Sequence, residues 1–305
     1  MKILFLVPLL ISFLNAEWLI VNNDGTLSSY NNTPYENNYA IPKEDINDEA
    51  ELSTTIIVKK HKRTNKRKKR KIIITDSKVR DKTVYLTFDD GPLNGTQNVI
   101  SILEESGIDA TMFMIGKHVE QNSYRKRLFK RAINDDNILV ANHTYSHASG
   151  HYRRFYSDDS RVVSDLRKMD RKLSYYDPLH TQKICRLAGR NVFRLPHIYK
   201  NDPAVKRAVE YRCYNALKNN GFKIFGWDYQ WDYSPKNAKL KKTPRQIVNI
   251  MERLIKRGRT KKPNKLILLT HDFTFKKRFR GDQKLRELIS LLKERGWGFE
   301  TLENY

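Results

Sequence analysis

The 305-residue chain has only two cysteines, too few for a disulfide framework or a four-cysteine zinc site. Its mean hydropathy of -0.69 excludes a membrane protein with several spans. Acidic residues are scarce, with 34 Asp and Glu against 58 Lys and Arg, so the formal net charge is +24. An aromatic content of 11% argues against a wholly disordered chain. The composition predicts an ordered, basic protein with an anionic partner, which could be nucleic acid, an acidic membrane or an acidic polymer.

Residues 1–16 begin with Met1-Lys2, continue as an apolar run and end at Ala16. This pattern is typical of a secretory signal peptide, although an uncleaved anchor and an N-terminal core element stay open. We expect export to the periplasm, the cell envelope or the medium, which weakens the nucleic-acid interpretation of the charge. Cys185 and Cys213 would then meet oxidising conditions, and either a disulfide or two buried thiols fits the sequence.

Residues 17–80 are expected to form a disordered or extended tail, because their first part is rich in Asn, Ser, Asp and Glu and in turn signals. The stretch 59–71 holds ten Lys or Arg in thirteen residues, and like charges this dense stay solvated. This basic run is either an electrostatic tether to an anionic envelope polymer or a soluble linker. Residues 1–80 carry 14 basic and 9 acidic residues, a net of +5, whereas the remainder carries 44 and 25, a net of +19. The expected folded domain, residues 81–305, is therefore itself basic.

Strand and helix patterns alternate from residue 81 onward. Such alternation predicts parallel strands with covering helices, as an open doubly wound sheet or as a barrel. The expected strands are 83–88, 110–115, 138–142, 192–195, 223–227, 265–270 and 298–302, and the expected helices are 98–105, 123–133, 160–173, 203–218, a segment opened by Thr243-Pro244, and 283–294.

Residues able to bind a metal or transfer protons follow several of these strands. Asp89-Asp90 ends the first strand, and His143 and His147 follow a later one with a spacing that suits one divalent metal if the segment turns helically. His271-Asp272 ends another strand. Each taken alone is better explained by strand-end capping or a polar turn at the surface. Together they predict one site, because active sites of parallel α/β folds lie at the carboxyl ends of strands.

Four segments resemble the motifs of the polysaccharide deacetylases, the NodB-homology domain of carbohydrate esterase family 4. The resemblance covers residues 81–305, and its first two motifs together are highly specific. The segments are Thr-Phe-Asp-Asp-Gly-Pro at 87–92, Asn-His-Thr-Tyr-Ser-His at 142–147, Arg-Leu-Pro-His at 194–197 and Leu-Leu-Thr-His-Asp at 268–272.

This resemblance implies a distorted (β/α) barrel with about seven parallel strands. It also implies a divalent metal, Zn²⁺ with Co²⁺ or Ni²⁺ as substitutes, held by Asp90, His143 and His147. Asp89 would be the general base, and Arg194 would pair with it. Two further roles follow. His271 would be the general acid, with a pKa that a carboxylate neighbour would raise, and the backbone N–H of His197 would help to hold the oxyanion.

The chain departs from the family's fourth motif, which places an Asp near a Trp to orient the acid histidine. Here Asp228 and Asp232 are four residues apart. Either could support His271, and we favour Asp232 because Asp228 falls closer to the strand. Trp231 and Tyr233 are candidates for lining the sugar groove, while core packing is the alternative for the tryptophan.

These observations predict a metal-dependent hydrolase that removes N-acetyl groups from an amino-sugar polymer, either peptidoglycan or a chitin-like polysaccharide. An O-acetyl esterase acting on a xylan-like polymer and a catalytically decayed carbohydrate-binding protein on the same fold are the alternatives. A nucleic-acid-binding protein is disfavoured, since no binding motif accompanies the basic run. We expect a monomer whose partner is the polysaccharide, with attachment to an anionic envelope polymer as an open hypothesis.

Overall fold

The computed structural model describes residues 16–21, 27–32, 82–178 and 180–305. The chain divides into two compact units, Met1–Ile72 and Ile73–Tyr305. In the first unit, strands β1 (Ala16–Val21) and β2 (Leu27–Asn32) pair as an antiparallel hairpin. This part of the expected tail is thus paired, as its run of Trp, Leu, Ile and Val favours. All but the last residue of the predicted signal peptide, residues 1–16, and the whole basic run 59–71 lie outside the described residues.

The second unit is built on one curled sheet. Its strand order is β10-β11-β3-β4-β5-β6-β9-β7-β8, and β12 also pairs with β3. The pairs from β10 to β9 are all parallel, whereas β7 runs antiparallel to both β9 and β8. The strands are β3 (Lys82–Gly91), β4 (Ala110–Met114), β5 (Ile138–Asn142), β6 (Ile184–Cys185), β7 (Phe193–Leu195), β8 (Ile198–Lys200), β9 (Lys223–Ile224), β10 (Tyr229–Gln230), β11 (Lys265–His271) and β12 (Trp297–Phe299).

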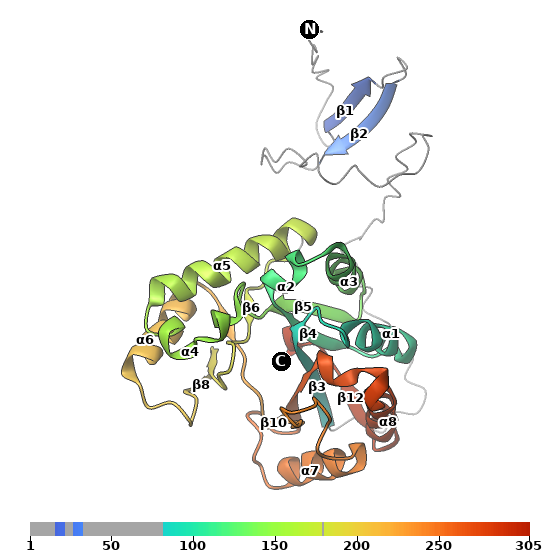
Figure 1. Ribbon diagram of the computed structural model, residues 1–305, viewed down its shortest axis with the longest axis vertical. Helices are drawn as coiled ribbons and strands as arrows, with labels where there is room; N and C mark the ends of the chain where they lie inside the picture. The colour runs from blue at the N-terminus through green and yellow to red at the C-terminus, as the bar shows by residue number, and fades with distance from the viewer. Residues whose placement is uncertain (1–15, 22–26, 33–81, 179) are drawn as a thin grey trace. The chain divides into compact units, whose positions relative to one another are not determined.

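Helices lie around the sheet (Figure 1) and form most of the connections between its strands, although β6 to β8 and β9 to β10 are joined by loops. The predicted distorted (β/α) barrel is confirmed as a curled sheet with covering helices. The helices are α1 (Thr96–Ser106), α2 (Gly116–Glu120), α3 (Ser123–Ile133), α4 (Tyr152–Phe155), α5 (Asp159–Tyr176), α6 (Ala208–Asn219), α7 (Pro244–Lys256) and α8 (Gly281–Glu294).

Side-chain capping sets the start of several helices. The Asn122 side chain accepts a hydrogen bond from the first turn of α3, and Asp158 does the same for α5. At α7, Thr243 and Gln246 form a reciprocal capping box, which satisfies two backbone donors that a helix start leaves free. The N-terminal signal Thr243-Pro244 in the sequence therefore marks the observed helix start.

Alternation along β3 separates two cores. Val84, Leu86 and Phe88 belong to the core under the helices, together with residues of α1 and α8. Tyr85 faces the inside of the curl, where the C-terminal Tyr305 ring lies 4.8 Å from it, centroid to centroid. Because side chains alternate along a strand, Asp89 shares the inner face with Tyr85 and comes at the carboxyl end of β3.

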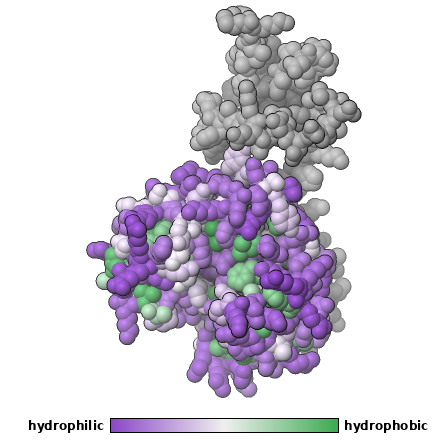
Figure 2. All heavy atoms as spheres, viewed as in Figure 1, coloured by the Kyte–Doolittle hydropathy of each residue, from purple (hydrophilic) through white to green (hydrophobic). Residues whose placement is uncertain are grey.

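The surface of this domain is polar. Figure 2 shows a face on which hydrophilic residues predominate and hydrophobic residues form small patches. Among the described residues, no helix combines the length and apolar character needed to cross a lipid bilayer. Cys185 and Cys213 are both buried and free, so the two-thiol alternative is the one found.

Candidate active site

Two adjacent carboxylates occupy the carboxyl end of β3. In a regular strand, Asp89 and Asp90 would point to opposite faces of the sheet. Here the pairing register with β4 shifts between Asp89 and Gly91, and Asp90 has a positive φ of 74°. His118 Nδ1 lies 2.8 Å from the backbone oxygen of Asp90 and donates to it. This local bulge re-aims one side chain, so both carboxylates reach the same site.

His143 and His147 come from the turn that follows β5. A helical turn was the condition under which the two rings would face one side, but Thr144 and His147 have positive φ values of 68° and 52°. The turn is instead held by hydrogen bonds from Thr144 N to Asn142 Oδ1 (2.8 Å) and from His147 N to Thr144 Oγ1 (2.8 Å). The two imidazole centroids lie 5.2 Å apart. The predicted pairing of the histidines is therefore present, with a different backbone conformation.

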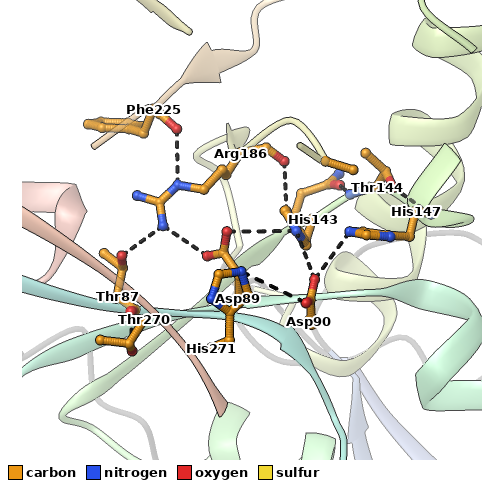
Figure 3. Close-up of polar contacts among 12 residues, drawn as sticks. Thr87, Asp89, Asp90, His143, Thr144, His147, Arg186, Phe225, Thr270 and His271 are labelled. Atoms are coloured by element: carbon orange, nitrogen blue, oxygen red, sulfur yellow. Dashed lines mark hydrogen bonds and ion pairs between the residues drawn. The ribbon is translucent and has the colours of Figure 1, made fainter. Parts of the chain in front are cut away.

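Three side chains form a candidate metal site, as the sequence predicted. Ligand atoms of Asp90, His143 and His147 all lie within 4.8 Å of one another. Asp90 Oδ1 is 3.3 Å from His143 Nε2 and 3.2 Å from His147 Nε2 (Figure 3). Burial alone would raise the pKa of Asp90, but hydrogen bonds from the two histidines hold this pKa well below its ordinary value.

The donor set fits a divalent cation. His143 Nδ1 lies 3.0 Å from the carbonyl oxygen of Arg186, and a carbonyl can only accept, so the proton is on Nδ1. A cation bound between His143 and Asp90 would displace the Nε2 proton that otherwise bonds the carboxylate, leaving the Nε2 lone pair and the carboxylate oxygen as its ligands. Such a hydrogen bond to the far ring nitrogen is the usual way in which proteins orient a histidine ligand.

A buried ion pair holds Asp89. Arg186 Nη1 lies 2.8 Å from Asp89 Oδ1 and 2.7 Å from the hydroxyl of Thr87. The same guanidinium donates to the carbonyls of Phe225 (3.2 Å) and Gly226 (2.9 Å), so four acceptors fix its plane. Oδ2 of Asp89, left free by this pair, faces His143 Nε2 at 3.7 Å.

The prediction that Arg194 pairs with Asp89 is wrong. The guanidinium of Arg194 donates instead to Asn215 Oδ1 at 2.9 Å and to the carbonyls of Phe193 and Lys200. The cause is the direction of β7, which runs antiparallel to β9 and so carries its C-terminal residues away from the site. Sequence reasoning missed Arg186, whose signal was its place directly after the apolar pair 184–185 of β6.

His197 is also outside the site. It lies in the exposed turn between β7 and β8, toward the amino ends of the parallel strands. Its predicted role as an oxyanion donor is therefore wrong, for the same topological reason that removes Arg194.

His271 lies beside the carboxylates because β11 pairs with β3 in a register that places it opposite Asp89. Its Nε2 is 4.0 Å from Asp90 Oδ2. Contrary to expectation, the pKa of His271 is lowered, because burial favours the neutral ring and the charges of Asp90 and Asp89 only partly offset this. The ring of Tyr233 packs edge-on against His271 at 5.0 Å, so Tyr233 borders the site, and its contact with a sugar stays a prediction.

The structure gives the fourth-motif residues other partners. Asp228 Oδ1 and Oδ2 accept hydrogen bonds from the backbone N–H groups of Lys261 (2.8 Å) and Ile267 (2.9 Å). Among the described residues, Nδ1 of His271 is buried without a hydrogen-bond partner, so neither Asp228 nor Asp232 supports it. The predicted pairing of Asp232 with His271 is thus wrong.

Trp231 belongs to the core. Its side chain is fully buried, its Nε1 donates to the carbonyl of Lys242 at 3.1 Å, and its ring packs edge-on against Phe275. The prediction that Trp231 lines the sugar groove is therefore wrong, and the core-packing alternative holds.

Asp272 supports the loop that carries the site. It is fully buried, and its Oδ2 accepts a hydrogen bond from the Thr96 hydroxyl, which itself accepts from Leu93 N at 2.6 Å. Burial raises the pKa of Asp272 to about 7. A Cβ on Gly91 would lie 2.9 Å from Asp272 Oδ2, so the turn after the carboxylates requires a residue without a side chain.

Comparison with known proteins finds similarity to polysaccharide deacetylases. Residues 76–215 match the model of the family described as polysaccharide deacetylase. The chain is 25% identical to a chitin disaccharide deacetylase of Vibrio alginolyticus, over 73% of this chain and 71% of that protein. It is 25% identical to a peptidoglycan-N-acetylglucosamine deacetylase of Bacillus cereus, over 73% of this chain and 87% of that protein.

A solved structure shares the fold. The catalytic domain of a peptidoglycan N-acetylglucosamine deacetylase from Eubacterium rectale superposes with a TM-score of 0.52 at 22% identity, covering 72% of this chain and 88% of that one. The resemblance seen in the sequence motifs is confirmed for residues 76–215, which match the model of the polysaccharide deacetylase family.

Proposed function

We propose that the domain is a metal-dependent hydrolase that removes N-acetyl groups from an amino-sugar polymer, either chitin-like or peptidoglycan. The names of its relatives, a chitin disaccharide deacetylase and a peptidoglycan-N-acetylglucosamine deacetylase, support this substrate class. One observation carries the proposal. Asp89 and His271 lie opposite each other on neighbouring strands, directly beside the trio Asp90, His143 and His147.

The trio would hold the divalent cation, for which we propose Zn²⁺, with Co²⁺ or Ni²⁺ able to replace it. A bound cation would supply Lewis acidity toward water and toward the acetyl carbonyl. Arg186 fixes the tautomer of His143 through its carbonyl and orients Asp89 through its guanidinium. One residue thus positions both a ligand and the base.

Amide hydrolysis requires a base for the attacking water and an acid for the departing nitrogen. Oδ2 of Asp89 is placed to accept the proton from water as the new C–O bond forms. Nε2 of His271 is placed to give a proton to the amine nitrogen as the C–N bond breaks, and acetate and a free amine result. The lowered pKa of His271 makes its protonated form a stronger acid toward that nitrogen.

We further infer that the protein is exported and acts as a monomer on a polymer of the cell envelope. The pattern of residues 1–16 supports export, and the net charge of +19 on residues 81–305 supports attraction to an acidic polymer. Detection of a mature form that begins after Ala16 in the exported fraction would test this. A full-length chain retained in the cytosol would contradict it.

The function is tested by acetate release from chitin oligomers, peptidoglycan and acetylxylan, before and after chelation and with metal restored. We expect release from the N-acetylated polymers that chelation abolishes and that Asp89→Asn removes. Full activity after chelation or in Asp89→Asn would contradict the mechanism. Release from acetylxylan alone would support the O-acetyl esterase, and no release from any polymer would support a decayed carbohydrate-binding protein.

A further inference from the structure

A basic pocket of about 720 Å³ lies beside the site, on the surface formed by α4 and the loops near it. Four arginines line it, from three separate segments of the chain. Its polar lining includes Tyr152, Arg153, Arg154, Ser157, Arg190 and Arg207.

The positive charge of the pocket is only partly compensated. Glu210, itself buried, accepts from Arg190 Nε at 2.8 Å and pairs with Arg207 Nη1 at 3.1 Å. Arg153 and Arg154 are exposed, and no contact found within residues 82–178 and 180–305 engages either guanidinium. Glu210 therefore pairs with two of the four guanidinium groups, and those of Arg153 and Arg154 stay available to a ligand.

The pocket shares a wall with the candidate metal site. The Tyr152 ring packs edge-on against His147, with centroids 5.8 Å apart, and the guanidinium of Arg190 lies 5.6 Å from the centre of the same ring. A Cβ at Gly189, which has a positive φ of 64°, would meet this tyrosine at 3.3 Å. One aromatic ring thus separates a metal-binding histidine from the basic pocket, and close packing fixes its place.

Guanidinium groups match carboxylate and phosphate oxygens in geometry and charge. A neutral sugar chain offers hydroxyl and carbonyl acceptors but no negative charge to pair with them. We propose that this pocket binds an anionic substituent, a carboxylate or a phosphate ester, on a glycan residue near the one that loses its acetyl group. The inference rests on the proposed deacetylase function and makes the preferred substrate an acidic N-acetylated polymer.

The test uses the full metal-loaded chain and oligomers of equal length that are neutral, carboxylated or phosphorylated. The double variant Arg153→Gln/Arg154→Gln is compared with Arg253→Gln/Lys256→Gln, a matched loss of two exposed charges on α7. We expect the pocket variant to lower the ratio of kcat/KM on the anionic oligomer to that on the neutral one at least about tenfold, through KM. The control should leave this ratio near the wild-type value.

Equal kcat/KM on neutral and anionic oligomers, or an equal fall in both variants, would overturn the proposal. Which anionic oligomer responds distinguishes carboxylate from phosphate. Calorimetric binding of the same oligomers separates this inference from the function. A chain that deacetylates no oligomer but binds the anionic one through Arg153 and Arg154 would support the anion-binding pocket and contradict the deacetylase function. Deacetylation with no preference for the anionic oligomer would support the function and contradict the pocket.

Discussion

Arg186 and Asp89 form a buried ion pair, with Nη1 2.8 Å from Oδ1 and both side chains at most 5% exposed. They lie 97 positions apart in the sequence, on β3 and directly after β6. Breaking such a pair by removing one partner costs about 3–5 kcal/mol, because a charge is left buried without compensation. The pair therefore joins two separate strand ends and orients the proposed base.

The first prediction contrasts two arginines. Arg186→Lys keeps a charge but loses the planar set of donors, so we expect kcat for acetate release to fall about 100-fold or more. Arg194→Lys, whose site lies away from Asp89, should cost less than about threefold. Acetate release, with thermal unfolding as a check on folding, measures both. The reverse order would restore Arg194 as the partner of Asp89.

The second prediction concerns metal affinity. His147→Ala removes one of three proposed ligands, and we expect Zn²⁺ affinity to fall about 100-fold or more. His197→Ala, in the exposed turn after β7, is the matched control and should keep wild-type affinity. Isothermal titration of the metal-free chain with Zn²⁺ gives both values. Equal affinities in the two variants would remove His147 from the ligand set.

The third prediction separates proton transfer from metal binding. His271→Ala should lower kcat about 10²–10⁴-fold, as expected for loss of a general acid, while the affinity for Zn²⁺ stays close to wild type. A parallel loss of affinity would instead make His271 a ligand. Kinetics and titration on the same preparation decide between the two.

The fourth prediction concerns Asp228 and Asp232, the two carboxylates at the place of the family's fourth motif. Asp228 accepts two backbone hydrogen bonds, so Asp228→Asn should lower the free energy of unfolding by about 1–3 kcal/mol. Asp232→Asn should change kcat by less than about threefold, because no contact joins it to His271. Urea unfolding and acetate release measure these effects. A large kcat loss in Asp232→Asn with intact stability would reinstate its support of the acid.

The fifth prediction follows from the buried Asp272 carboxyl, whose pKa burial raises to about 7, against about 3.9 for an unfolded Asp. Between these pH values the folded chain retains a proton on Asp272 that the unfolded chain has lost. The contribution of this carboxyl to the free energy of unfolding is therefore complete below about pH 4 and disappears as pH rises through 7. Asp272→Asn should make the free energy of unfolding less dependent on pH in this range. The exposed Asp136→Asn is the control. Urea unfolding of the metal-free chain between pH 4 and 8 measures the slopes, and equal slopes in all three chains would refute the assignment.

Local sequence signals predicted most of the proposed machinery. Asp89-Asp90 and His143 with His147 each lie within a few residues of a strand end, so hydrophobic pattern and residue type suffice to find them. β6 is two residues long, too short for any periodicity, and Arg186 was missed with it. The direction of a strand depends on tertiary structure. Because β7 runs antiparallel to β9, the prediction that Arg194 pairs with Asp89 was wrong.

The predictions for Trp231 and for Asp232 were wrong for a related reason. A Trp beside polar residues near a strand end fits a sugar-binding ring as well as a core residue, and only the packing against Phe275 decides. Likewise the spacing of Asp228 and Asp232 does not say which backbone donors a carboxylate will meet. The two donors that Asp228 meets, on Lys261 and Ile267, lie more than 30 positions away in the sequence.

Strand β3 has neighbours along both of its edges, with β11 on one side and β12 and β4 successively on the other. Amide hydrogens of a strand enclosed in this way exchange with solvent only when the whole domain opens. We therefore expect Asp89 and Asp90 to lie in a slowly opening part of the domain, whereas the side chains of Arg153 and Arg154 are exposed on the short helix α4. In hydrogen-exchange mass spectrometry, peptides from β3 should be the last to take up deuterium and those from α4 among the first. The proposed catalytic carboxylates would then lie on a rigid strand, and the arginines proposed to select the substrate on a more mobile helix.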